Sequence, residues 1–292
     1  MIKGMTSFLM SVFVLVLSGG FLMEDAHASD NDKIKVSVSL LPQAYIVERV
    51  GGDRVKIQVM IPSGASPATY EPTPQQLVML SHSRLYIKVG APTFPFEKKH
   101  FNSILQKNKK MIVINMSDGI EYRPLSCKKD QKDPHVWVAP STVSVAAGNI
   151  YNALARIDPN NRDYYKKNID LFLADIERLD KEIKAILAGK EGYSFMVFHP
   201  AWGYFADQYG LKQIPVEVGG KTPSASNIKE MIDTAREKGV KIIFVQKGFD
   251  KKSAETIAHA IGGRVMEMNP LEKDWVKNMK QIAEILSDAL RE

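Results

Sequence analysis

The hydrophobic and polar positions of residues 159–188 repeat with the period of an α-helix. Apolar side chains recur at alternating spacings of four and three residues, which keeps them on one face, while the remaining surface is mostly Lys, Asp, Glu and Arg. Pro159 suits the first position of a helix, and Gly189 offers a stop. About 30 residues rising 1.5 Å each give a rod of roughly 45 Å, longer than one small domain is wide. The apolar stripe consists of Tyr165, Ile169, Phe172, Ile176, Leu179, Ile183 and Ile186.

A helix with one apolar stripe has two common roles. It can pair with another helix as a coiled coil, or it can run along two lobes and tie them together. The chain has no second segment of this kind. We therefore favour the tie between two lobes.

Strand-like and helix-like segments alternate on both sides of this helix. Short apolar or alternating runs predict strands, and runs with helical spacing predict the helices between them. The predicted strands span 33–41, 55–61, 84–89 and 111–116 before the long helix, and 194–198, 213–218, 240–245 and 264–268 after it. The run 240–245 (VKIIFV) is almost continuously apolar, as in a parallel strand buried on both faces. The sequence thus predicts an α/β fold of two lobes with parallel sheets, joined by one long rigid helix.

The first 28 residues have the features of a secretory signal peptide. Lys3 provides a positive start, an apolar stretch begins at Phe8, and Ala26-His27-Ala28 is a cleavage site of the A-x-A type. The apolar stretch is too short for a membrane span, and no cysteine stands beside the cleavage site to carry a lipid. We expect a periplasmic protein with a signal peptide at 1–28, an N-terminal α/β lobe at 29–158, a linking helix at 159–189 and a C-terminal α/β lobe at 190–292.

Composition adds little beyond a globular protein with room for two domains. The chain has 292 residues, of which 45% are hydrophobic and 25% charged. Its only cysteine, Cys127, excludes an internal disulfide. The net charge is +6, but the lysines are scattered and no basic strip interleaved with aromatic residues appears. We expect no nucleic-acid partner and a monomeric protein.

Four loops beside the predicted strands carry the chemistry-bearing residues. In open parallel sheets, ligands bind beyond the carboxyl ends of the strands. His135 and His199 lie in two of these loops, one in each predicted lobe, and imidazole is the commonest protein ligand for borderline metals. A lone histidine is more often structural, but two at the strand ends of opposed lobes favour a metal site. The loops are 64–74 (GASPATYEPTP), 133–140 (DPHVWVAP), 198–204 (FHPAWGY) and 268–271 (MNPL).

These loops resemble those of the solute-binding proteins of zinc- and manganese-type ABC importers (cluster A-I). The resemblance extends through the mature chain, in the motifs G-x-SP-x-TYEPTP, DPHVW, FHPAWGYFADQYGL, IFVQ and NPL. In that family a rigid helix joins two α/β lobes with the metal between them. The resemblance implies capture of a divalent metal ion, zinc first and manganese second, and its delivery to an ABC transporter permease in the inner membrane.

The resemblance also implies a metal-ligand set that is incomplete in this chain. His135 and His199 match family ligands, and Asn269 stands at the position of the fourth ligand, usually an aspartate. Ala68 stands where the family has its first histidine, and Gln246 where an acidic residue is common. Replacing a carboxylate by an amide removes negative charge that helps to hold a divalent cation. The implied metal ligands are thus His135, His199 and Asn269.

Other donors could complete such a site. Water, Glu71 or Glu267 could join two imidazoles, and residues 127–132 carry no histidine where many zinc-binding members have a His-rich loop. Alternatively, the same fold could bind a metal chelate or a small organic ligand. Such a ligand would contact aromatic side chains near the loops, namely Tyr70, Trp137, Trp202 and Tyr204.

An enzymatic function is the most distant alternative. A secreted metal-dependent hydrolase would need a general base near the metal-bound water, and Glu71 is the only acidic candidate in the loops. No nucleophile elbow, phosphate loop or HExxH motif is present. We therefore expect a binding protein and no catalytic residues.

Overall fold

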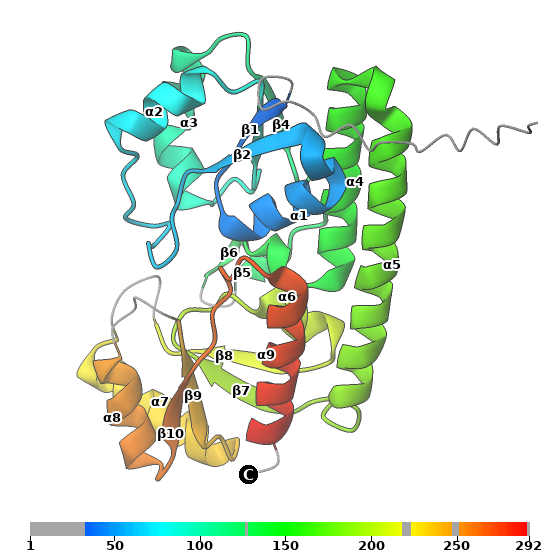
Figure 1. The fold of residues 1–292 in the computed structure, drawn as a ribbon. Helices are drawn as coiled ribbons and strands as arrows, with labels where there is room; N and C mark the ends of the chain where they lie inside the picture. Colours follow the sequence, from blue (N-terminus) through cyan, green and yellow to red (C-terminus); the bar gives the residue numbers. More distant parts are fainter. Residues whose placement is uncertain (1–32, 126–127, 218–222, 247–250, 291–292) are drawn as a thin grey trace, which may run out of the picture.

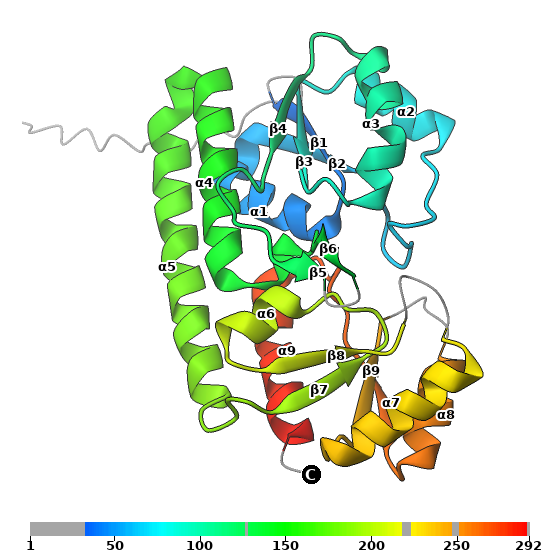
Figure 2. The same ribbon diagram turned by 180° about the vertical axis from the view of Figure 1, so that it is seen from behind.

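Two lobes stack along one long helix in the computed structural model, which describes residues 33–125, 128–217, 223–246 and 251–290 (Figures 1 and 2). Each lobe is built around a four-stranded parallel sheet. The predicted α/β fold of two lobes joined by a long helix is confirmed. The predicted signal peptide and Cys127 lie outside the described residues.

The N-terminal lobe forms its sheet from four parallel strands in the order β2-β1-β3-β4. The central strands are the most apolar, and Val36, Val38, Leu85 and Ile87 are buried between the helix layers. The elements are β1 (Ile34–Val38), α1 (Leu41–Gly51), a 3-10 turn (Gly52–Arg54), β2 (Val55–Val59), α2 (Pro74–Ser81), β3 (Leu85–Lys88), α3 (Pro95–Lys107), β4 (Ile112–Asn115) and α4 (Pro140–Ile157).

The C-terminal lobe repeats this architecture with the strand order β10-β9-β7-β8. All four residues of β9 are buried, as the continuous apolar run predicts. The elements are β7 (Ser194–Val197), α6 (Gly203–Gln208), β8 (Lys212–Pro215), α7 (Ala225–Glu237), β9 (Ile242–Val245), α8 (Lys252–Ala260), β10 (Arg264–Glu267) and α9 (Trp275–Ala289).

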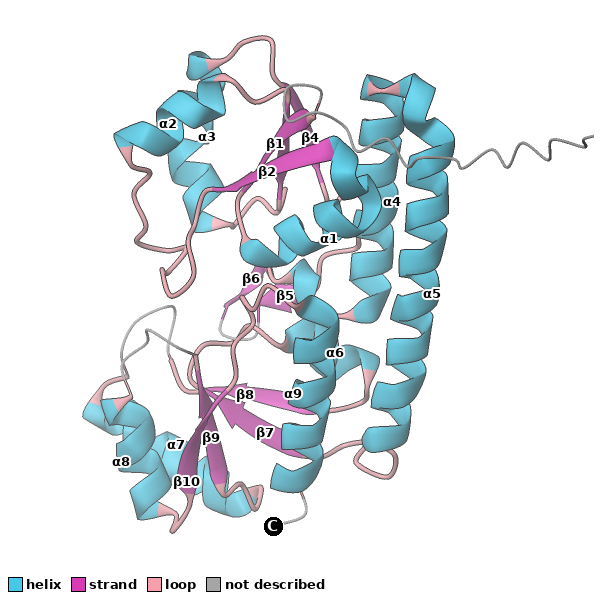
Figure 3. Ribbon diagram, viewed as in Figure 1, coloured by secondary structure: helices cyan, strands magenta, loops and turns pink. Residues whose placement is uncertain are grey.

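The long helix α5 (Arg162–Ile186) ties the two lobes together (Figure 3). It is shorter than the predicted segment 159–188, because Pro159–Asn161 form a separate 3-10 turn. Its predicted apolar stripe is buried, apart from the partly buried Ile186. The stripe packs against α1 and α4 of the N-terminal lobe and α9 of the C-terminal lobe.

Ion pairs hold α5 to both lobes beside this apolar seam. Arg49 of α1 pairs with Asp175 at 2.6 Å, and Lys280 of α9 pairs with Glu182 at 2.8 Å. The same helix therefore contacts both lobes through packing and charge. The interpretation of the segment as an intramolecular tie is correct.

A short antiparallel hairpin, absent from the sequence-based expectation, lies between the lobes (Figure 1). It joins β5 (Pro124–Leu125) to β6 (Lys128–Lys132), where the polar sequence predicts a loop. A 3-10 turn (Val136–Val138) then leads into α4. No helix in the described part of the chain has both the length and the apolar character needed to cross a bilayer.

Candidate metal centre

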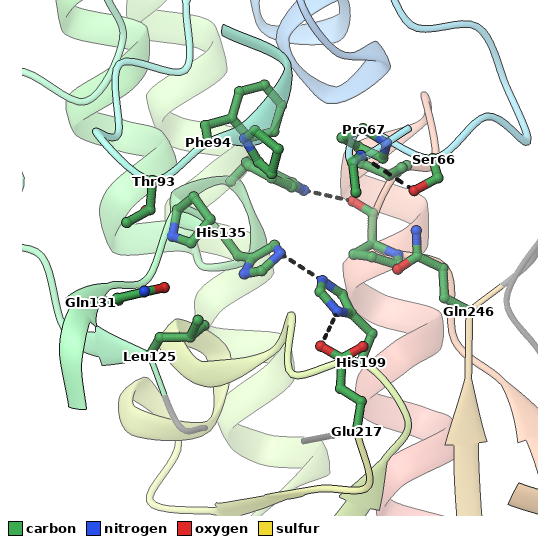
Figure 4. Close-up of a pocket in the computed structure, with 16 residues that line it drawn as sticks. Ser66, Pro67, Thr93, Phe94, Leu125, Gln131, His135, His199, Glu217 and Gln246 are labelled. Carbon is green, nitrogen blue, oxygen red and sulfur yellow. Dashed lines mark hydrogen bonds and ion pairs between the residues drawn. The ribbon is translucent and has the colours of Figure 1, made fainter. Parts of the chain in front are cut away.

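The two loop histidines face each other between the lobes (Figure 4). His135 follows the β5–β6 hairpin, and His199 follows the buried strand β7. Their Nε2 atoms are 3.1 Å apart, and their ring centroids are 5.0 Å apart. The structure therefore brings together two residues that are 64 positions apart in the sequence.

A fully buried carboxylate orients His135. Asp133 Oδ1 accepts hydrogen bonds from the His135 backbone N–H at 3.0 Å and pairs with His135 Nδ1 at 2.7 Å. Its other oxygen, Oδ2, accepts from Arg123 Nη1 at 2.8 Å. Burial alone would raise the pKa of Asp133, but His135 and Arg123 outweigh it, and the pKa lies below its usual value. Asp133 therefore remains ionised and fixes the imidazole ring through Nδ1.

A second carboxylate backs His199 in the same way. Glu217 Oε1 lies 2.9 Å from His199 Nδ1, and the glutamate is buried (Figure 4). Sequence reasoning missed Glu217, because it placed this residue inside the predicted strand 213–218. In the structure β8 ends at Pro215, so Glu217 emerges at the carboxyl edge of the sheet. An acidic residue near the end of a predicted strand is the signal that the sequence offers.

The histidine pair has the geometry of two metal ligands. When each Nδ1–H donates a hydrogen bond to the carboxylate behind it, the proton stays on Nδ1, and each Nε2 directs a lone pair toward the other ring. A separation of 3.1 Å with Zn–N bonds of about 2.0–2.1 Å corresponds to an N–Zn–N angle of about 100°, close to tetrahedral. Burial lowers the pKa of His135, which keeps its imidazole neutral as a metal ligand requires.

Asn269, the third residue predicted to bind metal, uses its side chain within its own turn. It follows β10, where its Oδ1 accepts from the Leu271 backbone N–H at 3.0 Å and its Nδ2 donates to Glu272 at 3.2 Å. Its neighbours Pro270 and Leu271 line the cavity beside the histidines, and Asn269 is not among the lining residues. Its role as a ligand therefore stays a prediction.

The other positions considered for the site differ in whether they line the cavity. Ala68 and the buried Gln246 both line the cavity. Glu71 instead forms an ion pair with Lys99 and lies 3.4 Å from His100 Nε2, and Glu267 lies 3.9 Å from Lys251. Neither glutamate lines the cavity. Across the described ranges, no cluster of three or more His, Cys, Asp or Glu side chains is arranged to hold a metal ion.

The histidines open into a cavity of about 240 Å³ between the lobes. In Figure 4, Phe94, Thr93, Gln131 and Leu125 surround the His135 side, while Ser66, Pro67 and Gln246 lie across from them. Of the four aromatic residues predicted to line a cleft, only Trp137 does so.

The other three aromatic residues take structural positions. Tyr70 bonds Gln76, Trp202 is buried, and Tyr204 donates to the Asp133 carbonyl at 2.9 Å. The cleft wall is therefore less aromatic than the sequence predicts.

The fold and the site together define a two-lobed substrate-binding protein of an ABC importer. The model of the family described as zinc-uptake complex component A, periplasmic, matches residues 36–289. The chain belongs to this family, and it is a binding protein rather than an enzyme, as predicted.

Relatives of the chain are named for more than one metal. It is 27% identical over 303 aligned residues to the high-affinity zinc uptake system protein ZnuA of Bacillus subtilis (strain 168), covering 95% of this chain and 94% of that protein. It is 27% identical over 265 residues to the manganese ABC transporter substrate-binding lipoprotein PsaA of Streptococcus mitis. This alignment covers 85% of this chain and 84% of that protein. A crystal structure of ZnuA superposes with a TM-score of 0.85 at 40% identity, covering 89% of this chain and all of that one.

Proposed function

We propose that this protein captures a divalent metal ion, zinc in the first place, between its lobes and delivers it to an ABC import permease. Manganese is the second candidate. The proposal includes secretion to the periplasm through a cleavable signal peptide and action as a monomer. The pair of imidazoles facing each other at 3.1 Å is the single observation that carries it.

The carboxylates behind the imidazoles support the proposal. Metal-bound histidines almost always donate their second ring N–H to a carboxylate, a carbonyl or water, which fixes the tautomer and the ring orientation. Asp133 and Glu217 provide this partner in one lobe each. A site with two oriented imidazole lone pairs suits zinc better than magnesium or calcium, which prefer oxygen ligands.

The first experiment measures the metal content of the protein and its response to metal. We expect protein purified from its native compartment to contain zinc by elemental analysis, and saturating zinc to raise the melting temperature of the metal-free protein. The double variant His135→Ala, His199→Ala should lose both effects. His82→Ala is a matched control, because His82 caps helix α2 away from the cavity.

The two measurements also identify outcomes that contradict the proposal. If zinc and manganese at saturation leave the melting temperature of the wild type unchanged, the protein does not bind these metals. A shift that persists in the double histidine variant would place the metal elsewhere on the chain.

A further inference from the structure

We propose that the site takes its metal together with a small organic chelator, a monoanion that binds the metal through one nitrogen and one oxygen and carries an apolar ring. This inference rests on the proposed function and names the form of the cargo. It depends on the shortage of protein donors, the volume of the cavity, the chemistry of its walls and the local charge.

The described residues supply too few donors for a bare zinc ion. Structural zinc sites use four protein ligands, and even open catalytic sites use three. Here the imidazoles of His135 and His199 face the cavity, while Asp133 is committed to His135 and Arg123. Ala68 also lines the cavity but has no donor atom on its side chain. Glu217 is paired with His199, and Gln246 offers only an amide oxygen, which is not among the usual ligands of zinc. Two coordination positions therefore remain for a ligand from outside the chain.

The cavity is larger than a bare ion requires. Its volume is about 240 Å³, whereas an apolar cavity of about 150 Å³ already accommodates benzene. A metal ion bound to the two Nε2 atoms would fill only a small part of this space. The remainder has room for a ring together with the two donor atoms of a chelator.

Apolar side chains line the cavity on both sides, among the polar side chains of Ser66, Thr93, Gln131 and Gln246. Phe94, Leu125 and Trp137 come from the N-terminal half, and Pro270 and Leu271 come from the C-terminal lobe. A ring bound between these side chains removes apolar surface from water, at about 25 cal/mol for each Å² buried. The walls thus favour a ligand with an apolar body.

The charge around the site selects a monoanion. A divalent cation contributes +2 and Glu217 contributes −1, while Asp133 is compensated by Arg123. One carboxylate on the metal would complete the neutralisation. No lysine or arginine is among the described residues that line the cavity, so these residues offer no cationic partner to additional carboxylates. The described walls therefore favour an α-amino acid or a pyridine-2-carboxylate over a polyanion such as citrate.

Equilibrium dialysis at buffered free zinc tests this inference. The probes are zinc alone, zinc with pyridine-2-carboxylate, zinc with benzoate and zinc with citrate, and both zinc and the organic ligand are counted on the protein. We expect pyridine-2-carboxylate to bind with zinc in a 1:1:1 complex and to raise zinc affinity at least tenfold. Benzoate is the matched control, because it has the ring and the carboxylate but lacks the nitrogen donor.

Substitutions at Ala68 separate the donor shortage from the cavity volume. Ala68 is exposed on the loop before α2, so replacements there should leave the fold intact. Ala68→His would supply a third imidazole, and it should bind zinc tightly without the chelator. Ala68→Phe would fill the cavity without adding a donor, and it should abolish the gain produced by pyridine-2-carboxylate. Each titration is repeated with Cys127→Ser, because the thiolate of this cysteine could bind zinc by itself and add to the signal.

The outcomes distinguish this inference from the proposed function. If zinc alone binds as tightly as zinc with pyridine-2-carboxylate, the inference is wrong and the proposed function stands. An equal gain with benzoate or citrate would also overturn it, because the chelate and the charge would then be irrelevant. If zinc does not bind under any condition, the proposed function itself fails.

Discussion

Replacing Asp133 by asparagine tests whether the carboxylates behind the histidines tune metal binding. Asp133 is fully buried and uses both oxygens, Oδ1 toward His135 and Oδ2 toward Arg123. The side chain of an asparagine has one acceptor oxygen, so it can accept from only one of these two partners. If its oxygen faces His135, its NH₂ group opposes Arg123 Nη1. If it flips, the NH₂ group opposes His135 Nδ1, which must then accept, so that Nε2 carries the proton and cannot bind metal.

The size of the effect follows from these two orientations. Loss of the outer hydrogen-bond partner of a metal-bound histidine typically reduces affinity about 10- to 100-fold, which is about 1.4–2.7 kcal/mol. The NH₂ group opposes Arg123 Nη1 in the first orientation and the backbone N–H of His135 in the flipped one. A buried donor therefore faces another donor in either case, which should lower the unfolding free energy of the metal-free protein by about 1–3 kcal/mol. We therefore expect Asp133→Asn to weaken zinc binding and to lower the melting temperature.

Competition with a fluorescent zinc indicator measures the affinity, and urea unfolding measures the stability. Asp207→Asn is the matched control, because Asp207 also pairs with Arg123, at 2.7 Å, but its side chain is 59% exposed. We expect this control to keep its zinc affinity. An unchanged affinity in Asp133→Asn would refute the claim that the carboxylate holds His135 in its metal-binding tautomer.

Two further substitutions test contacts near the site. Burial raises the pKa of Glu97, although Ser39 and two backbone N–H groups donate to it. Because the folded state then keeps a proton that the unfolded state releases, wild-type stability should fall as the pH rises from about 4.5, and urea titrations of Glu97→Gln should lack this slope. In Gly203→Ala, the new Cβ would lie 1.8 Å from Arg123 Nη1. The methyl group should displace the guanidinium from Asp133 and lower the free energy of unfolding by about 1–3 kcal/mol. Thermal unfolding measures this loss, and an unchanged melting temperature would contradict it.

The long helix and the strands could be predicted because their patterns are local. The stripe from Tyr165 to Ile183 has helical spacing, and its members are the residues that α5 buries. The run 240–245 has the continuous apolar character of β9. The β5–β6 hairpin could not be predicted, because Lys128–Lys132 has no alternation of apolar and polar residues. A hydrogen bond from the Asp133 N–H to the Arg123 carbonyl at 2.9 Å extends the pairing of the two strands by one residue. This contact joins residues ten positions apart, and no local pattern in the sequence predicts it.

The sequence predicts only those site residues that lie in the loops at the ends of the predicted strands. His199 directly follows an apolar strand, and the motif around His135 is rich in turn-forming and apolar residues, so both were found. The partners behind them were not assigned. Asp133 stands beside His135 in the sequence but acts through a buried contact with Arg123, and Glu217 required knowledge of where β8 ends. Charge partners depend on tertiary distances, and a single sequence does not specify these.

The separation of the two histidines is fixed by contacts that do not involve metal. Trp137 Nε1 donates to the Pro270 carbonyl at 2.8 Å, Tyr204 donates to the Asp133 carbonyl, and Arg123 bonds Asp207 across the lobes. These hydrogen bonds join the lobes on either side of the imidazole pair, whose Nε2 atoms are 3.1 Å apart. Opening the lobes must break them, at a net cost of about 0.5–1.5 kcal/mol for each neutral bond. Release of the cargo, as proposed, therefore requires that the permease compensate this cost with contacts of its own.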